Sequence, residues 1–590
     1  MTDHAMTEGV AEHAEPEWGS DVVADFLHAT GVPYIALNPG ASFRGLHDSL
    51  VNYLGATTTP QLLMCLHEEH AVAVAHGYAK VTGEPLAVAL HSNVGLMHAS
   101  MAMYNAWADR VPILVIGATG PIDAAKRRPW IDWIHTSSDQ AALVRSFVKW
   151  DDQPMSVAAT VEALVRAWDI TRTPPHAPTY VVLDAAVQEQ RLAEAVDMPP
   201  METHPPRDIP VASTESVRRA AAELGSAANP VVLMGRVSRS THDWEQRVRL
   251  VEALGAKVIT DLKAGAAFPT RHPAHVPGPA FFLSAGAQRV LADADVVLSL
   301  DWIDLAGTLS QAPSGQPRHI ISASQDAQLH NGWSKDHQAR PHVDTLLPTT
   351  PDLAVHQLAL ALGLNSAPTA RHPPHALSSP RPAEPTAHPL RLADLAASLR
   401  AALDGVDTCL VRLPLGWNGD DWQFDHPLDY LGYDGGGGIG SGPGMLVGAA
   451  LALKGTRRLP VGVLGDGDYL MGVQALWTAA HDNISLLAIV SNNRSYFNDE
   501  VHQERVARLR GRDVSRRWVG QRIDDPPPDL AAMARAQGLE GIGPVTRLEE
   551  LPEALDRAVR LVLAGRPVVV DVVVEVGYSA DMSAGLVREQ

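Results

Sequence analysis

Cysteine and positive charge are both scarce in this chain. Only two of its 590 residues are cysteines, Cys65 and Cys409, so a disulfide framework is excluded and a reducing, intracellular compartment is expected. Lysine and arginine number 47 against 67 aspartates and glutamates, which gives a net charge of −20. Such an acidic balance argues against a nucleic-acid or membrane-surface partner.

Long apolar runs are missing as well. No uncharged apolar stretch reaches the length of about eighteen residues that a membrane span needs, so no such helix is predicted. The first twenty residues are acidic and lack the apolar core of a signal peptide, so we expect a cytoplasmic protein. With 46% apolar residues and too much length for one core, the chain is typical of a globular protein of about three to four domains.

Two proline-rich stretches divide the chain, one at about residues 188–210 and one at residues 366–389. Such segments cannot hold a core and are typical of linkers. They predict domains over residues 18–187, 211–365 and 390–575, with tails over residues 1–17 and 576–590.

Each predicted domain alternates short β-branched runs with helical patterns. The clearest runs are PLAVALHS, VPILVIGA, TYVVLD, PVVLMG, KVITDL, DVVLSL, HIISAS, LPVGVLGDG, SLLAIVSNN and PVVVDVVVEV. Unbroken apolar strands separated by helices indicate parallel sheets covered on both faces. We therefore predict an α/β protein with three doubly wound parallel-sheet domains, whose ligands lie at the carboxyl ends of the strands.

A Gly-Asp-Gly stretch and an Asn-Asn pair each follow a predicted strand. Gly465 and Gly467 would let the backbone approach a phosphate, and Asp466 would present a carboxylate oxygen. Asn493 lies 27 positions after Asp466, at the end of the next strand. Mg²⁺ prefers oxygen ligands, and Asp466, Asn493 and the carbonyl of Ser495 could bind it together with diphosphate oxygens and water. Either motif alone would be an ordinary turn, but the pair favours a metal site.

Glu68, in LHEEHAVAVAHGYAK, is the other conspicuous group. It precedes a predicted helix over residues 71–81, in an apolar setting that could desolvate its carboxyl. The ordinary alternative is that Glu68 and Glu69 are solvated helix charges. Zinc is not expected here, because the metalloprotease motif places two histidines four positions apart and His67 and His70 are three apart.

Asp466-Gly467 through Asn492-Asn493 resembles the thiamine diphosphate motif of the superfamily of benzoylformate decarboxylase, pyruvate decarboxylase and acetohydroxyacid synthase. The resemblance covers nearly the whole chain and implies pyrimidine-binding, central and diphosphate-binding domains, in that order. It implies thiamine diphosphate and Mg²⁺ as cofactors, with Glu68 at the pyrimidine nitrogen N1′ as the group that activates the carbon nucleophile. Ile439 would be the apolar wedge under the bent cofactor.

The same resemblance implies a larger set of cofactor contacts and an oligomer. The expected contacts are Leu415, Gly416, Gly438, Ile439, Gly440, Gly465, Asp466, Gly467, Asp468, Asn493, Ser495 and Tyr496. The halves of one site would come from different subunits of a homodimer or homotetramer. Whether FAD or ADP occupies the central domain stays open, and Arg236 and Arg239 are either phosphate ligands there or ordinary surface charges.

Four residues stand where family members keep proton-transfer groups, namely His91 in AVALHS, His135 in WIHTSSD, His272 in FPTRHP and Asp499. Histidine suits this work because it titrates near neutrality. The chain also departs from its relatives. Benzoylformate decarboxylases carry Ser directly after Asn-Pro-Gly, where this chain has Ala41 followed by Ser42. Synthases carry Ser-Gly-Pro-Gly where this chain has residues 91–95.

These features imply a 2-oxo acid decarboxylase or carboligase that works through ylid and enamine intermediates on a small-molecule 2-oxo acid or acyl substrate. An acetolactate-synthase-like carboligase with FAD and a 2-hydroxyacyl-CoA lyase are the alternatives. A non-catalytic relative is disfavoured, because it would be expected to lose Glu68.

Overall fold

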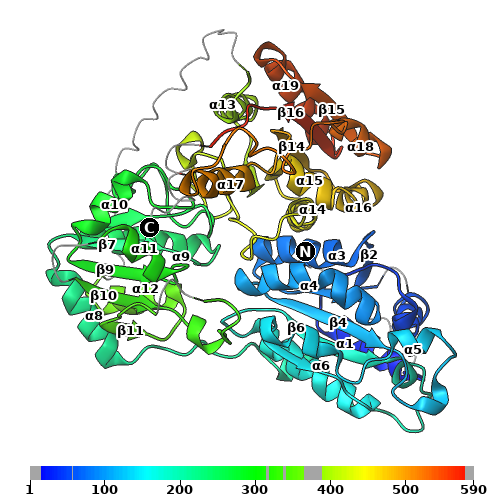
Figure 1. Ribbon diagram of the computed structural model, residues 1–590. Helices are drawn as coiled ribbons and strands as arrows, with labels where there is room; N and C mark the ends of the chain where they lie inside the picture. Colours follow the sequence, from blue (N-terminus) through cyan, green and yellow to red (C-terminus); the bar gives the residue numbers. More distant parts are fainter. Residues whose placement is uncertain are drawn as a thin grey trace, which may run out of the picture.

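The computed structural model describes residues 15–55, 58–313, 318–335, 340–364, 389–578 and 582, and places them in three lobes, each built on one parallel sheet (Figure 1). Most of both predicted tails and of the predicted linker over residues 366–389 lies outside the described residues. Within the described residues, no helix has the length and apolar character needed to cross a membrane.

The amino-terminal sheet has the strand order β2-β1-β3-β4-β6-β5. Its strands are β1 (Tyr34–Leu37), β2 (Gln61–Met64), β3 (Leu86–Ala89), β4 (Ile113–Thr119), β5 (Trp150–Asp152) and β6 (Thr179–Asp184). Successive residues of β3 and β4 face opposite cores, as the pleat requires. One face packs against α1 (Gly19–Ala29) and α6 (Val157–Arg172), and the other against α3 (Glu68–Thr82) and α4 (Ser92–Ala108).

The central sheet has the order β11-β10-β9-β7-β8. Its strands are β7 (Pro230–Met234), β8 (Lys257–Ile259), β9 (Val296–Leu300), β10 (His319–Ala323) and β11 (Thr345–Leu347). Helices α8 (Thr214–Ser226), α9 (Thr241–Leu254) and α12 (Pro351–Ala361) cover one face, and α10 (Ala285–Ala292) and α11 (Leu305–Gln311) cover the other.

The carboxyl-terminal sheet has the order β12-β13-β14-β16-β15. Its strands are β12 (Thr408–Arg412), β13 (Leu459–Gly465), β14 (Leu487–Asn492), β15 (Glu540–Val545) and β16 (Val568–Val573). Helices α14 (Gly442–Leu453), α16 (Ala475–His481) and α18 (Leu530–Ala536) pack on one face, and α13 (Leu392–Ala402) and α19 (Leu551–Leu563) on the other. The prediction of three doubly wound parallel sheets is therefore confirmed.

Helices α3 and α14 join the amino-terminal and carboxyl-terminal lobes, and they lie side by side in Figure 1. Glycine permits the close approach. A Cβ on Gly77 would lie 2.0 Å from the Met445 carbonyl oxygen, and one on Gly448 would lie 1.9 Å from that of Val74. One apolar core runs across this seam from the first sheet to the third. The seam therefore fixes the start of α3 relative to the carboxyl-terminal sheet.

Candidate active site

A cavity of about 280 Å³ opens at the carboxyl ends of β12, β13 and β14, where a parallel sheet is expected to bind ligands. Most of the predicted cofactor contacts line it: Leu415, Gly416, Ile439, Gly465, Asp466, Gly467, Asp468, Asn493, Ser495 and Tyr496. Asp499, at the start of α17 (Phe497–Leu509), lines it too. Gly438 and Gly440 do not. Gly438 instead contacts the Asn105 side chain, through hydrogen bonds of 3.1 and 3.3 Å.

Asp466 is the buried carboxylate of this cavity, at the first residue of α15 (Asp466–Gly472). Its Oδ1 accepts the Gly467 N–H at 3.0 Å, and its buried Oδ2 has no hydrogen-bond partner among the described residues. Burial raises the pKa of Asp466 to about 6. The side-chain oxygen of Asn493 lines the same cavity and accepts the Ser495 N–H at 2.9 Å. An unpartnered buried carboxylate oxygen beside an amide oxygen fits a hard cation such as Mg²⁺.

Arg412 and Asp468 form an ion pair in the cavity wall. The Asp468 Oδ1 accepts the N–H groups of Gly440 at 2.6 Å and Gly442 at 3.2 Å, and its Oδ2 lies 3.3 Å from the Arg412 Nε. The buried Arg412 also pairs with Asp434 at 2.8 Å. Sequence reasoning missed Arg412. The only signal was one cation that ends an apolar strand, TCLVR.

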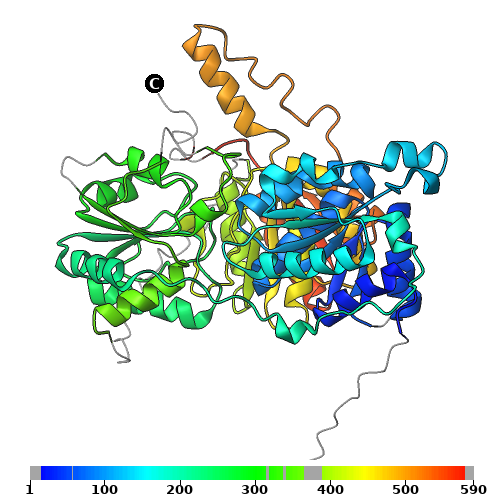
Figure 2. The same ribbon diagram turned by 90° about the horizontal axis from the view of Figure 1, so that it is seen from below.

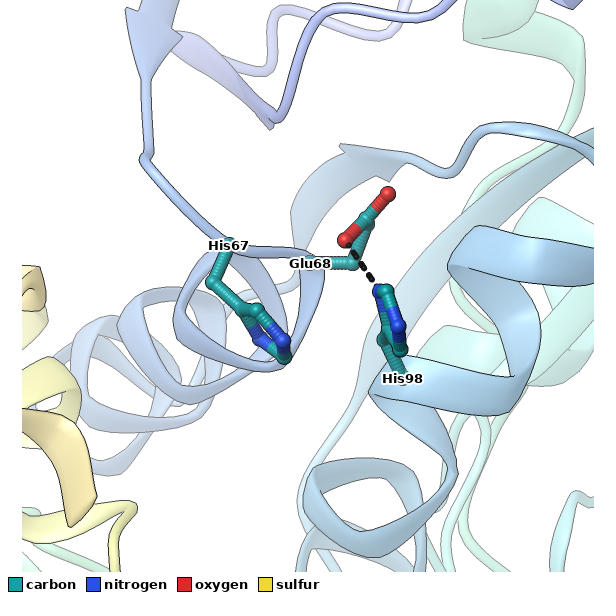
Figure 3. A group of neighbouring side chains, drawn as sticks. All are labelled: His67, Glu68 and His98. Atoms are coloured by element: carbon teal, nitrogen blue, oxygen red, sulfur yellow. Dashed lines mark hydrogen bonds and ion pairs between the residues drawn. The ribbon is translucent and has the colours of Figure 1, made fainter.

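Glu68 lies at the start of α3, and its side chain is 7% exposed. His98 on α4 donates from Nδ1 to the Glu68 Oε2 at 3.0 Å, as Figure 3 shows. Within the described part of the chain no other hydrogen bond reaches the Glu68 carboxylate, and Glu68 does not line the cavity that contains Asp466. The sequence analysis did not single out His98. It lies on α4, seven positions after His91, the residue that precedes this helix, and no motif of the sequence marks it.

His67, Glu68 and His98 together bring three possible metal ligands within 4.8 Å of one another. The hydrogen bonds argue against a metal there. His67 Nδ1 accepts the Glu69 N–H at 3.2 Å, so the proton of the neutral ring is on Nε2 and neither nitrogen is free to bind a metal. The cluster is better described as a hydrogen-bonded carboxylate with two stacked imidazoles.

In the amino-terminal domain, the Asn-Pro-Gly-Ala-Ser segment, which ends at Ser42, contacts the segment that contains His91. His91 and His135 lie edge to face with ring centroids 4.7 Å apart. The Ser42 Oγ lies 2.9 Å from the His91 Nδ1 and accepts the Ser92 N–H at 3.0 Å. Ser42 therefore reaches the histidine although Ala41 directly follows Asn-Pro-Gly. Burial, and to a smaller extent His135, lowers the pKa of His91, which favours the neutral base.

The remaining predicted residues lie apart from this group. His272 is in the central domain, where its Nε2 lies 3.2 Å from the Glu252 carboxylate and its ring packs against Phe268. Glu69 lies near the third domain, since burial and, to a smaller extent, the charge of Asp468 raise its pKa.

Arg236 and Arg239 are neither exposed charges nor free phosphate ligands. Arg236 pairs with Asp301 at 2.8 Å and with Asp326 at 3.0 Å, and it donates to the Ala108 carbonyl oxygen of the amino-terminal domain at 3.2 Å. Arg239 donates to five backbone carbonyl groups, among them that of Leu431 at 2.9 Å. Both arginines therefore tie the central domain to its neighbours, which is a correction to both expected roles.

The fold and the cavity define a class of protein: a three-domain α/β protein with a ligand-sized cavity at the carboxyl ends of the strands of its last domain. Three family models match in the same order. They describe the thiamine pyrophosphate (thiamine diphosphate) enzyme N-terminal TPP-binding domain at residues 17–143, the central domain at residues 217–329 and the C-terminal TPP-binding domain at residues 416–572. The chain belongs to the thiamine pyrophosphate enzyme family.

Individual relatives are distant but span most of the chain. Benzoylformate decarboxylase of Pseudomonas aeruginosa is 25% identical over 86% of this chain and 91% of its own length. An acetolactate synthase large subunit of Lactococcus lactis is 22% identical over 95% and 93%. A probable 2-ketoarginine decarboxylase of Pseudomonas aeruginosa is 26% identical over 84% and 83%. The solved 4-hydroxybenzoylformate decarboxylase of Rhodococcus jostii shares the fold, with a TM-score of 0.75 at 22% identity over 95% of this chain and 99% of that one.

Proposed function

We propose that this protein is a thiamine diphosphate- and Mg²⁺-dependent 2-oxo acid decarboxylase or carboligase. The observation that carries the proposal is the buried Oδ2 of Asp466. No described residue hydrogen-bonds to it, and it shares one cavity with Asn493, Ser495 and the Gly465–Gly467 turn. The decarboxylases and the acetolactate synthase among its relatives support a reaction at a carbonyl next to a carboxylate.

The bound cofactor would supply a carbon nucleophile that attacks such a carbonyl. Asp466, the side chain of Asn493 and the Ser495 carbonyl would hold Mg²⁺, and Gly465 and Gly467 would leave room for the diphosphate. Glu68 would share a proton with the pyrimidine N1′ through Oε1, the oxygen that His98 does not occupy. His91, held by Ser42, is the proposed proton acceptor and donor nearest the substrate, with His135 beside it.

A complete site would need two copies of the chain, as a homodimer or homotetramer. Glu68 does not line the cavity of its own chain. The surface around it is apolar and open, since Met97 is 59% exposed, Leu66 39% and Val94 36%. A second copy would cover this surface and bring its own Asp466 cavity to Glu68.

The alternatives with FAD or coenzyme A depend on the central domain. A cavity of about 590 Å³ there is lined by Arg110 and Arg236, among other residues. Both guanidinium groups already pair with Asp326, Arg110 at 2.6 Å and Arg236 at 3.0 Å. A nucleotide phosphate would have to displace the Asp326 carboxylate, so the expected absorbance spectrum of the purified protein contains no flavin band.

The proposal is tested by incubating purified protein, thiamine diphosphate and Mg²⁺ with a panel of 2-oxo acids that bear aromatic, aliphatic and cationic side chains. Release of CO₂ is followed with and without added aldehydes. Decarboxylation of at least one acid, dependent on both cofactors, is expected. Omission of Mg²⁺ is the matched control. Cofactor-independent CO₂ release, or none across the panel together with no binding of thiamine diphosphate, would overturn the assignment.

A further inference from the structure

We infer that His242, Asp243 and His356 form a binding site for a divalent transition-metal ion, with Zn²⁺ as the expected occupant. One ligand atom from each residue lies within 4.8 Å of the other two. None of the three lines the cavity that contains Asp466, and the inference does not depend on the proposed function. They belong to the central lobe, the teal-to-green part of the chain in Figure 1 and Figure 2.

Two neighbouring helices supply the three ligands. His242 and Asp243 are in the first turn of α9, and His356 is in α12, which packs beside α9 on the same face of the central sheet. The His356 Nε2 lies 2.8 Å from the Asp243 Oδ1, and the two imidazole rings have centroids 5.6 Å apart and planes 19° apart. A tetrahedral zinc site places its ligand atoms about 3.4 Å apart. Small rotations of these side chains therefore suffice to bring all three ligand atoms onto one ion.

The Asp243 carboxylate is already oriented for this purpose. The Ser238 Oγ donates to its Oδ2 at 3.0 Å, while its Oδ1 faces His356. Although burial alone would raise the pKa of Asp243, the hydrogen bonds from His356 and Ser238 lower it, so the group is a carboxylate at neutral pH. A hydrogen bond to the outer oxygen of a metal-binding carboxylate fixes the geometry of the ligand, which is the part that Ser238 would take.

Both histidines have a nitrogen that can bind an ion. His242 is exposed, and no hydrogen bond from another described residue reaches its ring. His356 is bonded through Nε2, and its partner there is the second ligand. When the ion binds, the proton of the neutral His356 ring moves from Nε2 to Nδ1, and Nε2 becomes the ligand. His67 differs, because its Nδ1 accepts the backbone N–H of Glu69, which an ion cannot replace.

The ligand set selects the kind of ion. Two imidazole nitrogens and one carboxylate oxygen suit Zn²⁺ and its transition-metal neighbours, whereas Mg²⁺ prefers oxygen ligands. Since three protein ligands leave a fourth position to water and the start of α9 is the positive end of a helix dipole, we expect micromolar affinity. The ion would join the start of α9 to α12 at the edge of a cleft of about 770 Å³ between the central and amino-terminal lobes, which Asp243 and His356 line.

The test measures Zn²⁺ binding to the full chain, freed of metals and then supplied with thiamine diphosphate and Mg²⁺. Calorimetry with Zn²⁺ as titrant compares wild type with His356→Ala, Asp243→Asn and Ser238→Ala. We expect each variant to weaken the strongest binding event about 10-fold or more, because even outer-shell partners of metal ligands contribute that much. His342→Ala is the matched control, since His342 pairs with Asp344 at 3.0 Å in the same domain and has no third ligand among the described residues.

Two further measurements separate this site from other histidines of the chain. Zn²⁺ should raise the melting temperature of wild type and of His342→Ala more than that of Asp243→Asn, because the site exists only in the native fold. Anomalous scattering at the zinc edge from crystals grown with Zn²⁺ should place an ion between His242 and His356. Variants that bind Zn²⁺ as strongly as wild type, or an ion found only at other places, would overturn the inference.

Discussion

In the carboxyl-terminal domain, the groups proposed to hold the diphosphate and the cation line one cavity of a single chain. In the amino-terminal domain, Glu68 and His91 lie outside that cavity, next to exposed apolar side chains such as Met97. The carboxyl-terminal half-site is lined by the carboxyl ends of β12, β13 and β14 and by the start of α15, whereas the amino-terminal one carries exposed apolar side chains. This difference supports the proposal that the carboxyl-terminal half-site binds the cofactor, that the amino-terminal half-site activates it, and that the two meet between copies of the chain.

The largest expected effect separates binding from activation. Asp466→Ala should weaken thiamine diphosphate binding about 100-fold or more, because it removes the charged oxygen proposed to hold the cation. Glu68→Gln should bind the cofactor within a few-fold of wild type but lower turnover about 10²- to 10⁴-fold, the usual contribution of a proton-transfer group. Calorimetry and CO₂ release measure the two quantities.

Each variant has a neighbouring control. Asp499→Asn alters a carboxylate at the rim of the same cavity and should leave cofactor affinity nearly unchanged. Glu69→Gln alters the residue next to Glu68. Burial, and to a smaller extent the charge of Asp468, raises the pKa of the Glu69 carboxyl, and His98 bonds to Glu68 rather than to Glu69. A Glu69→Gln enzyme as inactive as Glu68→Gln would remove the distinction between the two acids.

Mixing two inactive variants tests whether the halves meet between copies. Glu68→Gln and Asp466→Ala chains, unfolded and refolded together, should form mixed dimers in which one of the two sites keeps both native residues. Random pairing would restore about a quarter of wild-type activity. If each site were built within one chain, the mixture would recover no activity, which would contradict the proposed position of the site between copies. Each variant refolded alone is the control.

Sequence patterns predict the interior of this fold well and its edges poorly. The predicted strands are all found, among them β4, β9, β13 and β14. In the described part of the chain six strands lie at sheet edges, and five of them, β2, β5, β11, β12 and β15, carry no pattern that predicts them. Edge strands are less buried by neighbouring elements than central strands, and they tolerate glycine, proline and bulges in their sequences. One residue of β2 is buried, and β15 (EGIGPV) contains two glycines and a proline.

The same reasoning explains what the site predictions missed. The turn after β13 and the Asn-Asn pair after β14 are local, and adjacent parallel strands bring their ends together without further information. Arg412 ends an unpredicted edge strand, and its pairing with Asp468 depends on the strand order. The contact of Glu68 with His98 joins two helices thirty positions apart in sequence, so it needs the crossing of α3 and α4.

The seam between α3 and α14 gives a smaller effect that acts on both halves at once. Gly448→Ala would place a Cβ 1.9 Å from the Val74 carbonyl oxygen, so one helix must shift. We expect a loss of about 3 kcal/mol in the free energy of unfolding, measured by urea titration. Gly225→Ala in α8 meets only ordinary contact at 3.5 Å and should not destabilise the fold. Equal midpoints for the two variants would contradict the close approach.

The smallest expected effect is a pH dependence at the same seam, carried by His70 on α3. Burial, and to a smaller extent His67, lowers the pKa of His70 to about 4, and the residue is 2% exposed. Between that value and the ordinary value of 6.5, the unfolded chain binds a proton that the native chain does not, so acidification favours unfolding. At pH 5 the resulting loss in the free energy of unfolding is about 2 kcal/mol, at 1.36 kcal/mol per pH unit.

His70→Gln should therefore lose less stability than wild type between pH 7.5 and about pH 5. His47→Gln, which alters an exposed histidine, should follow the wild-type curve. Parallel curves for His70→Gln and wild type would mean that acid acts on other groups, and that the start of α3 is less desolvated than its packing against the third domain indicates.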